Sequence, residues 1–509
     1  MNRQLTTSAV VVVVVGIVYL ASFGLAITHF TYDEWGVLVV VPPMVLLCAA
    51  LLRHMFRGDL APIARIMYVG LVAKLAGAAL RYWVGFEAYQ GGIDAQRYHT
   101  YAVTAAADVW DGTSSIFDIF HAGTGTRVME SVAAAVYVMT GTSKMAGFVS
   151  FALLGFIGTA CFVKAACIAI PGLATHRYAL LCILMPSLVY WPSSIGKDAV
   201  MLFTLGVATY GIARLLSGNA VLGPVIITGL GLIGAAYVRP HLVGLWLAGT
   251  FPALLVALVR GRSSSSGEPA KPLDRAILVP VIIVATIGLV LVSLTTVRYL
   301  NPTSEDTGLS GTSVTNILDE TTRRTEQASS SFVPPSISNP TKWPYASVRT
   351  LTRPLLIEAR GSAQLFTALE MTLLLALAAA SYRRLLHLPK LLVTNPYVAF
   401  SMTTLFLSGL AFTSFANLGV LARQRSIVFP FLLLVLCLPP LPHRAEHDPE
   451  HADGSARTDD LAALRQNNSM SPSVNAQFAS GGAPTSLTAR QVSTGPPPGS
   501  GTNDDSIWG

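Results

Sequence analysis

The sequence predicts an all-α membrane protein, a polytopic bundle of about twelve transmembrane helices. Hydrophobic residues make up 52% of the 509 residues and charged residues only 12%, whereas an ordinary soluble domain contains roughly 25% charged residues. The mean hydropathy is +0.55. Most of the apolar runs are about 20 residues long, which is enough for a helix to cross ~30 Å of hydrocarbon.

The first apolar run covers residues 8–28 and follows Arg3, as a signal peptide would. It is longer than the roughly 7–15-residue apolar core of a signal peptide, so we expect a retained signal anchor. The remaining runs begin near Val37, Ile66, Ala146, Tyr178, Asp198, Leu222, Leu242, Ala276, Gln364, Tyr397 and Ser426. Prolines inside several runs are compatible with a bundle, because neighbouring helices can satisfy the freed backbone groups.

Basic residues in the short loops predict the orientation of the spans. With the N-terminus inside, the cytoplasmic turns contain Arg and Lys repeatedly, which is the positive-inside pattern. Two long segments, about 87–143 and 298–361, then lie outside, and in the first of them residues 101–119 and 128–139 have the pattern of short amphipathic helices on the membrane surface. We expect a multi-pass protein of a bacterial cytoplasmic membrane with both termini in the cytoplasm.

The C-terminal segment differs in composition from the rest of the chain. Residues 441–509 are rich in His, Ser, Asn, Gly and Pro, and they contain too little apolar surface to offset the entropy lost on ordering. We therefore expect a transmembrane domain over residues 1–440 and a disordered cytoplasmic tail over 441–509. The linker 261–275 is expected to be a mobile inner loop. No internal repeat is evident in the sequence, which weakens an inverted-repeat transporter interpretation.

The charge distribution and the cysteines exclude two classes of site. The net charge is +7, but the basic residues lie at the ends of apolar runs and not in one block, so no nucleic-acid site is expected. The five cysteines all fall inside apolar runs without metal-type spacing. They are expected to be small hydrophobic residues in helices, so neither a disulfide nor a zinc site is indicated.

Four polar motifs fall on the predicted outer face, and three of them carry basic residues at the ends of apolar runs. The motifs are GGIDAQRYH (91–99), YWPSSIGKD (190–198), YVRPH (237–241) and ANLGVLARQR (416–425). Lys197, Arg239, Arg423 and Arg425 break the positive-inside pattern there. A basic side chain at membrane depth costs ~2.5–3.5 kcal/mol unless it is paired or reaches water, so several together predict an anionic partner. We expect a site for a phosphate or pyrophosphate group, since Arg suits forked contacts and Lys a point contact.

The motif 91–99 provides the candidate catalytic acid. Asp94 lies at the entry of a loop rich in Gly, Tyr and His after the third span, and an acid in that setting could act as a general base on a hydroxyl group, with its pKa raised by partial burial. Tyr98 and His99 are expected to shape the acceptor pocket, and His241 to donate to a phosphate or a sugar hydroxyl. Asp198 is a further pocket candidate, because it cannot readily neutralise its helix neighbour Lys197.

Three segments resemble signatures of known membrane proteins. MPSLVYWPSSIGKDAVMLF, SVRTLTRPLLIEARG and NLGVLARQRSIVFPFLLL resemble three signatures of a bacterial family of envelope membrane proteins. More broadly, the many spans, the acidic residue in a long outer loop, the surface helices and the basic helix ends resemble the C-class membrane glycosyltransferases and the related O-antigen polymerase and ligase group. The resemblance covers about residues 81–438.

The resemblance implies sugar transfer on the outer face from a polyprenyl phosphate or pyrophosphate carrier, in cell-envelope polysaccharide biosynthesis. Asp94 would match the catalytic acid of the first large loop, and Arg423 and Arg425 would match the arginines that hold the carrier's phosphates. The pattern departs from transferases that have two acids in an Asp-x-Asp or Glu-x-Asp pair, because Ala95 and Gln96 follow Asp94. Dependence on a divalent metal is therefore left open.

Each site residue also has a structural alternative. Asp94 could be an ordinary loop carboxylate, and Lys197 with Asp198 could form a helix start capped by Ser193 or Ser194. Arg423 and Arg425 could extend to lipid head groups. Arg353 and Glu358, five residues apart, would not align on one helix face, so a structural role fits them as well as a pocket role.

Other functions remain open at this point. A glycan polymerase or ligase would use the same residues as a transferase of single sugars. A lipid-linked sugar transporter or flippase would place polar groups through the bilayer, and a non-catalytic assembly protein would not need four basic groups at outer helix ends. The partners that the sequence predicts are the lipid bilayer and a polyprenyl-linked sugar or glycan; it indicates no protein partner.

Overall fold

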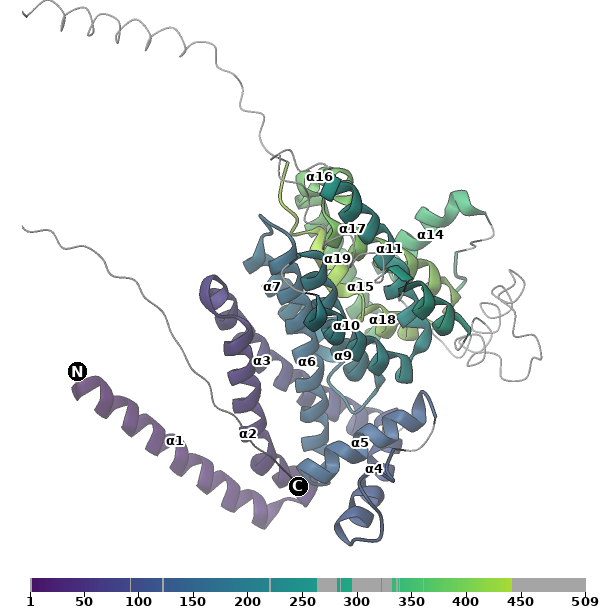
Figure 1. Cartoon of the computed structure of the whole chain (residues 1–509). Helices are drawn as coiled ribbons and strands as arrows, with labels where there is room; N and C mark the ends of the chain where they lie inside the picture. Colours follow the sequence, from purple (N-terminus) through teal and green to yellow (C-terminus); the bar gives the residue numbers. More distant parts are fainter. Residues whose placement is uncertain are drawn as a thin grey trace, which may run out of the picture. The chain divides into compact units, whose positions relative to one another are not determined.

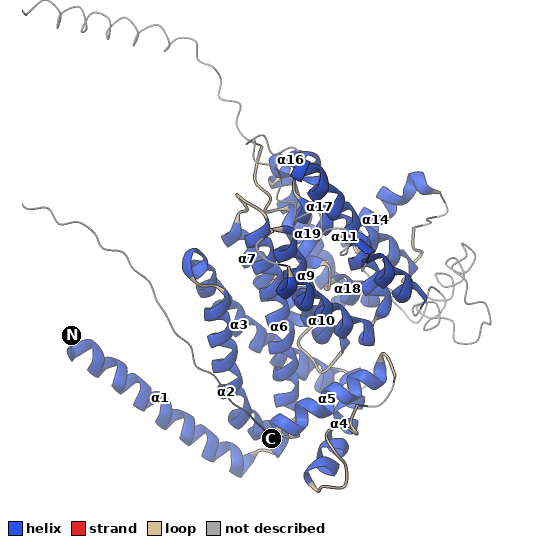
Figure 2. Ribbon diagram, in the orientation of Figure 1, coloured by secondary structure: helices blue, strands red, loops and turns tan. Residues whose placement is uncertain are grey.

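In the computed structural model, the chain divides into two units, Met1–Pro442 and His443–Gly509. The structure describes residues 2–91, 93–120, 123–218, 221–262, 282–283, 285–294, 322, 332–335, 337, 339–359 and 361–441. The predicted tail, most of the linker 261–275 and much of the loop 298–361 lie outside these residues. Within them the chain forms helices and loops, without a β-strand (Figure 2), so the all-α prediction is confirmed.

Most helices of the first unit are labelled in Figure 1. Their bounds are α1 (Asn2–His29), α2 (Tyr32–Met55), α3 (Ala61–Trp83), α4 (Asp94–Trp110), α5 (Thr126–Thr140), α6 (Lys144–Ala169), α7 (Thr175–Leu184), α8 (Pro186–Tyr190), α9 (Lys197–Leu216), α10 (Leu222–Val238), α11 (Pro240–Arg262), α14 (Trp343–Thr352), α15 (Ser362–Ala380), α16 (Tyr382–Thr394), α17 (Pro396–Ala411), α18 (Leu418–Arg425) and α19 (Phe429–Val435). Short turns of other helix types are η1 (Gly58–Leu60), η2 (Val84–Ala88), η3 (Pro340–Lys342), η4 (Leu356–Glu358) and η5 (Phe412–Ser414).

Six helices of the described part are long and apolar enough to cross a membrane, or up to eight if two sharply bent helix pairs each count as one span. The six are Tyr32–Met55, Gly58–Ala88, Lys144–Ala169, Lys197–Leu216, Pro240–Val259 and Pro396–Ser414. The bent pairs are Gln364–Ala380 with Tyr382–Thr394, at 79°, and Leu418–Arg425 with Phe429–Val435, at 70°. A membrane protein with several spans is thus supported, but the predicted count of about twelve is not confirmed.

The difference in span number has a physical cause. Several apolar runs do not form one straight helix of span length: the run from Tyr178 is broken before Pro186, where the preceding residue is extended, as expected before proline. The run from Leu222 gives only the 17 residues of α10. The run from Ala276 lies largely outside the described residues. A hydropathy window cannot detect these breaks, because it measures composition and not backbone direction.

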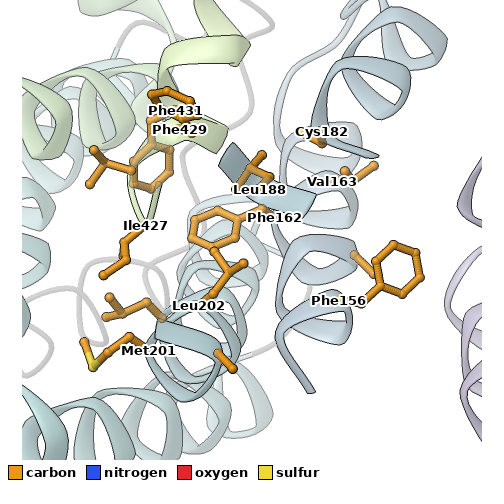
Figure 3. Packing of buried hydrophobic residues seen from close by; sticks show 14 of the residues in the cluster. Phe156, Phe162, Val163, Cys182, Leu188, Met201, Leu202, Ile427, Phe429 and Phe431 are labelled. Atoms are coloured by element: carbon orange, nitrogen blue, oxygen red, sulfur yellow. The ribbon is translucent and has the colours of Figure 1, made fainter. Parts of the chain in front are cut away.

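Helix α6 occupies the centre of the bundle. It packs against α9, α2 and α3, while α9 packs against α10 and α11 packs against α17. The backbones of α6 and α9 approach closely, because a Cβ atom on Gly158 would overlap the carbonyl of Leu202; small residues permit such contacts in membrane bundles. Figure 3 shows Phe162 of α6, Leu202 of α9 and Phe431 of α19 in one buried cluster.

The two ends of α6 define the two ends of the bundle. At its start, Ser143 Oγ donates to the carbonyl of Asp33 at 2.7 Å, and the amphipathic helices α4 and α5 lie at this end. At its other end, Asn395 Nδ2 donates to the carbonyl of Ala169 at 3.0 Å. The 26 residues of α6 span ~39 Å at 1.5 Å per residue. Helices are found near both stretches for which the sequence predicted amphipathic helices. Helix α4 starts and ends earlier than the expected 101–119, and α5 covers the expected 128–139.

Candidate functional site

Helix α9 places the first two residues of the candidate site. After α8 ends at Tyr190, a buried turn leads through Gly196 into Lys197 and Asp198, the first residues of α9. The N-cap residue is Gly196 and has no side-chain cap. Lys197 and Asp198 thus form the helix start that the structural alternative described, but neither Ser193 nor Ser194 caps it. The Ser193 hydroxyl donates to the carbonyl of Val189 in the preceding turn.

Asp198 joins two arginines from distant parts of the chain. Arg239, the C-cap residue directly after α10, donates from Nη2 to Asp198 Oδ1 at 3.1 Å. Arg423, near the end of α18, donates from Nε to the other carboxylate oxygen, Oδ2. Asp198 and Arg239 are both buried, so this carboxylate compensates charges that would otherwise be costly to place there. Its role in the structure is that of an anchor for the two guanidinium groups.

Asp94 also contacts the cluster, at its exposed side. It is the first residue of α4, and its Oδ2 lies 3.3 Å from Nη1 of Arg423. Arg423 therefore connects two carboxylates, one buried and one accessible. The Asp94 side chain is 64% exposed; the partly buried setting that the sequence suggested for this acid is not found. Exposure leaves the carboxylate accessible to an incoming ligand.

Polar partners complete the surroundings of the cations. Lys197 Nζ donates to Thr126 Oγ1 at 3.0 Å, at the start of α5. Arg239 Nη1 donates to Gln424 Oε1 at 2.9 Å. The sequence analysis missed Thr126, for which no signal was available, and Gln424, whose place in the quoted motif beside Arg423 was a signal.

Tyr98 faces the same cluster from α4. Burial, and then the charge of Asp94, raise the pKa of Tyr98 to about 12, and a hydrogen bond with Thr126 and the charges of Arg423 and Arg239 oppose this rise. The phenol therefore keeps its proton at neutral pH and can donate a hydrogen bond. Because α4 carries both Asp94 and Tyr98, one turn of this helix presents a carboxylate and a hydroxyl group to the cations.

The cluster carries more positive than negative charge. Three cations, Lys197, Arg239 and Arg423, face two carboxylates, Asp94 and Asp198. Exposure increases from the buried Asp198 and Arg239, through Arg423 with 27% of its side chain exposed, to Asp94. The arrangement is a cationic site that opens on the side of α4, which suits an anionic ligand that approaches from that side.

The two histidines occupy different positions. His99 points away from the cluster, and its Nδ1 lies 2.7 Å from the hydroxyl of Tyr137 on α5. Burial, and then the charge of Lys144, lower the pKa of His99 to about 4, so it is neutral at pH 7 and links α4 to α5. His241 follows Arg239 by two residues, and its buried Nδ1 has no hydrogen-bond partner among the described residues.

Arg425 does not join the cations with which the sequence grouped it. It is fully buried, and its Nη1 donates to the carbonyls of Leu351, at 3.0 Å, and Arg353. Its guanidinium carbon lies 5.1 Å from the ring centre of Phe429. Residues i and i+2 of a helix point in different directions, which is why Arg423 and Arg425 have separate surroundings. The structure gives Arg425 the position of a packing residue.

Arg353 and Glu358 form an ion pair that the sequence analysis did not expect. Arg353 Nη2 lies 2.7 Å from Glu358 Oε1. The expectation assumed one helix, but α14 ends at Thr352 and the chain turns before η4, which brings the two side chains together. Burial acts to raise the pKa of Glu358, but hydrogen bonds from Arg353 and from the Leu355 N–H outweigh it and hold that pKa below its usual value.

A second acid, Glu370, was missed by the sequence analysis. It lies buried in α15 and accepts hydrogen bonds from the Ser187 N–H, at 2.7 Å, and from the Ser187 hydroxyl. It therefore ties α15 to the start of α8. A lone carboxylate inside an apolar span is itself a signal, and it could have been used. Lys74 in α3 is also buried, and it donates to the carbonyl of Leu188 at 2.8 Å.

The described residues contain no group of three or more His, Cys, Asp or Glu side chains that could hold a metal ion. The two carboxylates of the cluster, Asp94 and Asp198, both contact Arg423. No step of the chemistry below is assigned to a metal.

The lining of an apolar cavity extends along the chain to within three residues of Arg239. The volume of the cavity is about 680 Å³, and it is lined by α9, α10, α11 and residues 285–292. Ala236 and Val243 line it, and these residues stand three before and four after Arg239 in the sequence. At its other end are Leu216 and Leu222, so along α10 the cavity extends ~21 Å at 1.5 Å per residue.

Comparison of the chain with protein-family models, with curated proteins and with solved structures found no match in any of the three. The resemblance to membrane glycosyltransferases therefore stays a prediction from the motifs, and the function is argued below from the geometry of the site.

Proposed function

We propose that the protein is an integral membrane glycosyltransferase of the bacterial cell envelope, which transfers a sugar from a polyprenyl phosphate or pyrophosphate carrier at the extracytoplasmic face. The observation that carries this proposal is the meeting of Lys197, Arg239 and Arg423 with Asp94. Four separate chain segments contribute these residues, since they come from α9, the end of α10, α18 and α4.

An anionic ligand is the natural partner of such a cluster. Asp198 is already engaged by both arginines, so the charge of Lys197 is left without a direct carboxylate contact among the described residues. Arg423 and Lys197 present donors on the open side of the site, while Arg239 lies deeper. A phosphate or pyrophosphate group provides several acceptor oxygens and the missing negative charge.

A lipid-borne phosphate is favoured over a free one by the apolar cavity. The cavity extends from the neighbourhood of Arg239 along α10 and has an almost entirely apolar lining. A polyprenyl chain in this cavity would place its phosphate at the cations. The burial of an apolar chain would then contribute to affinity, at roughly 25 cal/mol per Å² of surface removed from water.

The chemical step assigns a role to each group. The acceptor hydroxyl attacks the anomeric carbon of the sugar while Asp94 takes the hydroxyl proton. The bond between the anomeric carbon and the carrier oxygen breaks, and its electron pair leaves with the phosphate. Lys197, Arg239 and Arg423 stabilise the charge that grows on the phosphate, which is usually the largest contribution to such catalysis. Asp94 becomes free to act as a base when the phosphate replaces it as the partner of Arg423.

The test measures incorporation of envelope glycan in cells that depend on this protein. We expect Asp94→Asn to reduce incorporation by about 10²- to 10⁴-fold, the usual contribution of a general base, with an unchanged amount of protein in the membrane. Asp111→Asn, at the C-terminal end of the same helix α4, is the matched control and should keep full activity. Full activity of Asp94→Asn would reject the proposed role of the carboxylate.

A binding measurement separates the phosphate site from the chemistry. Purified protein should bind polyprenyl phosphate, and Asp94→Asn should bind it at least as tightly, since the phosphate has to displace the Asp94 carboxylate from Arg423. If neither polyprenyl phosphate nor polyprenyl pyrophosphate binds the intact protein, the proposal of a carrier-dependent transferase is wrong.

A further inference from the structure

Helix α16 has an exposed surface that the proposed function does not use. It follows α15 at an angle of 79° and lies at the end of the unit opposite α4 and α5 (Figure 1). The residue after α16, Asn395, donates to the last residue of α6. Since α6 spans ~39 Å, α16 lies about one membrane thickness away from the candidate site.

One side of α16 packs on the protein. His387 is buried, and its Nδ1 lies 2.9 Å from the carbonyl of Pro439. Arg384 donates to the carbonyl of Leu438. These contacts fix the rotation of the helix about its axis, so the direction of every other side chain of α16 is determined.

The exposed side of α16 divides into an apolar strip and a basic strip. Tyr382, Leu386 and Val393 are 54%, 63% and 69% exposed. At 100° per residue they fall within about 40° of one another around the helix. Arg383 and Lys390 are also exposed, and they lie about 60–80° further round.

We infer that α16 lies in the plane of the membrane surface, with Leu386 and Val393 in the acyl region and with Arg383 and Lys390 at the head groups of acidic phospholipids. Tyr382 lies at the boundary between them, because its hydroxyl accepts a hydrogen bond from Arg383 Nε at 3.2 Å. Two adjacent strips of this kind are the pattern of an interfacial helix, which buries an apolar face shallowly and is attracted to anionic lipid by its basic residues. The inference does not depend on sugar transfer.

Position in the membrane is tested with a spin label at one introduced cysteine. The five native cysteines are buried or half-buried, so an exposed thiol can be labelled selectively. In vesicles of phosphatidylcholine and phosphatidylglycerol, we expect a label at Leu386→Cys to collide with oxygen and not with a water-soluble nickel complex, and a label at Arg383→Cys to show the reverse. Access of the nickel complex to both positions would overturn the inference, because the helix would then face water. Shielding of the Leu386→Cys label from both reagents would also overturn it, because a protein partner would then cover the helix.

Lipid selectivity is tested by native mass spectrometry of the full chain released from the same mixed vesicles. The unaltered protein should retain phosphatidylglycerol in preference to phosphatidylcholine, and the double variant Arg383→Gln with Lys390→Gln should lose that preference. The matched control is Arg57→Gln with Arg65→Gln, which removes two exposed arginines from the loop and helix start after α2. The assignment to α16 is overturned if the first variant keeps the preference, or if the control loses as much.

Discussion

Arg423 and Arg425 stand two residues apart on the short helix α18, yet they belong to different regions of the molecule. Arg423 reaches two carboxylates, Asp198 and Asp94, and 27% of its side chain is exposed. Arg425 is fully buried and donates to the backbone carbonyls of Leu351 and Arg353. At 100° per residue, the two side chains leave the helix ~200° apart.

The comparison shows that the partners of a buried cation determine what it can do. The partners of Arg423 are charged, and one of them is exposed, so a ligand can exchange with Asp94. The hydrogen-bond partners of Arg425 are backbone carbonyls at the turn between α14 and η4. They cannot leave Arg425 unless the backbone of that turn moves. The same residue type therefore supplies a candidate ligand contact in one region and a packing contact in the other. The following predictions test this division.

The largest effect is expected for Arg425→Met. The substitution leaves two backbone carbonyls without their donor and leaves the buried Glu370 without the positive charge that attracts it. Removal of one partner from a buried charged network costs about 3–5 kcal/mol. We expect a marked fall in the unfolding temperature of the detergent-solubilised protein, or loss of the protein from the membrane fraction.

The double variant Arg425→Met with Glu370→Gln sharpens this test. If the two charges stabilise each other, Glu370→Gln should cost less in the Arg425→Met background than in the unaltered protein, because no partner charge is then left to lose. Strictly additive changes in unfolding temperature would show that Arg425 acts only through the carbonyls.

The next largest effect is expected for Arg423→Met, and it concerns ligand binding. Asp198 keeps its contact with Arg239, so the unfolding temperature should fall less than in Arg425→Met. A hydrogen bond to a charged group contributes ~1.5–3 kcal/mol, which corresponds to a roughly 10- to 150-fold weaker affinity for polyprenyl phosphate. Equal loss of stability in the two variants, with unchanged affinity in Arg423→Met, would contradict the division between them.

Much of the general fold could be predicted from the sequence, because apolar composition and run length reflect the solvent of a helix directly. The meeting of Asp94, Lys197, Arg239 and Arg423 could be anticipated from the predicted orientation, since each stands at an end of an apolar run on the same side. The sequence did not show which cation pairs with which acid. Asp198 is an anchor for two arginines that come from residues 239 and 423, and no local pattern encodes that contact.

Other features could not be predicted because they depend on where helices break. The window criterion counted about twelve spans, whereas sharp bends at residues 381 and 426–428 divide apolar runs into shorter helices. The same difficulty affected Arg353 and Glu358. These residues pair because α14 ends at Thr352, before both of them, and the chain then turns. Glu370 is a different case, since the lone acid was visible in its apolar run.

A smaller effect on binding is expected for Lys197→Met. Lys197 contributes a single compact charge, and its present contact is one hydrogen bond to Thr126. We expect the affinity for polyprenyl phosphate to fall by about tenfold or less, with little change in stability. Lys144→Met is the matched control, because Lys144 is also the first residue of a helix at the same end but pairs with Asp33. A similar loss of affinity in the control would mean that general surface charge, and not the cluster, attracts the phosphate.

The smallest effect is expected at the Arg353–Glu358 pair, which belongs to the region around Arg425. It concerns the stability of the fold and depends on pH. The pKa of Glu358 in the folded protein is below its ordinary value of 4.5. Its stabilising contribution is therefore complete above the ordinary pKa and is lost as the pH falls through the folded pKa. A partly exposed pair of this kind contributes up to about 1 kcal/mol. Glu358→Gln should lower the unfolding temperature slightly at neutral pH, and the difference from the unaltered protein should disappear as the pH falls through the lowered pKa of Glu358. Arg353→Gln should weaken the same pH dependence without abolishing it, because the hydrogen bond from the Leu355 N–H, which also lowers the pKa, remains. A difference that stays constant over the whole pH range would show that the pair does not stabilise the fold through its charge.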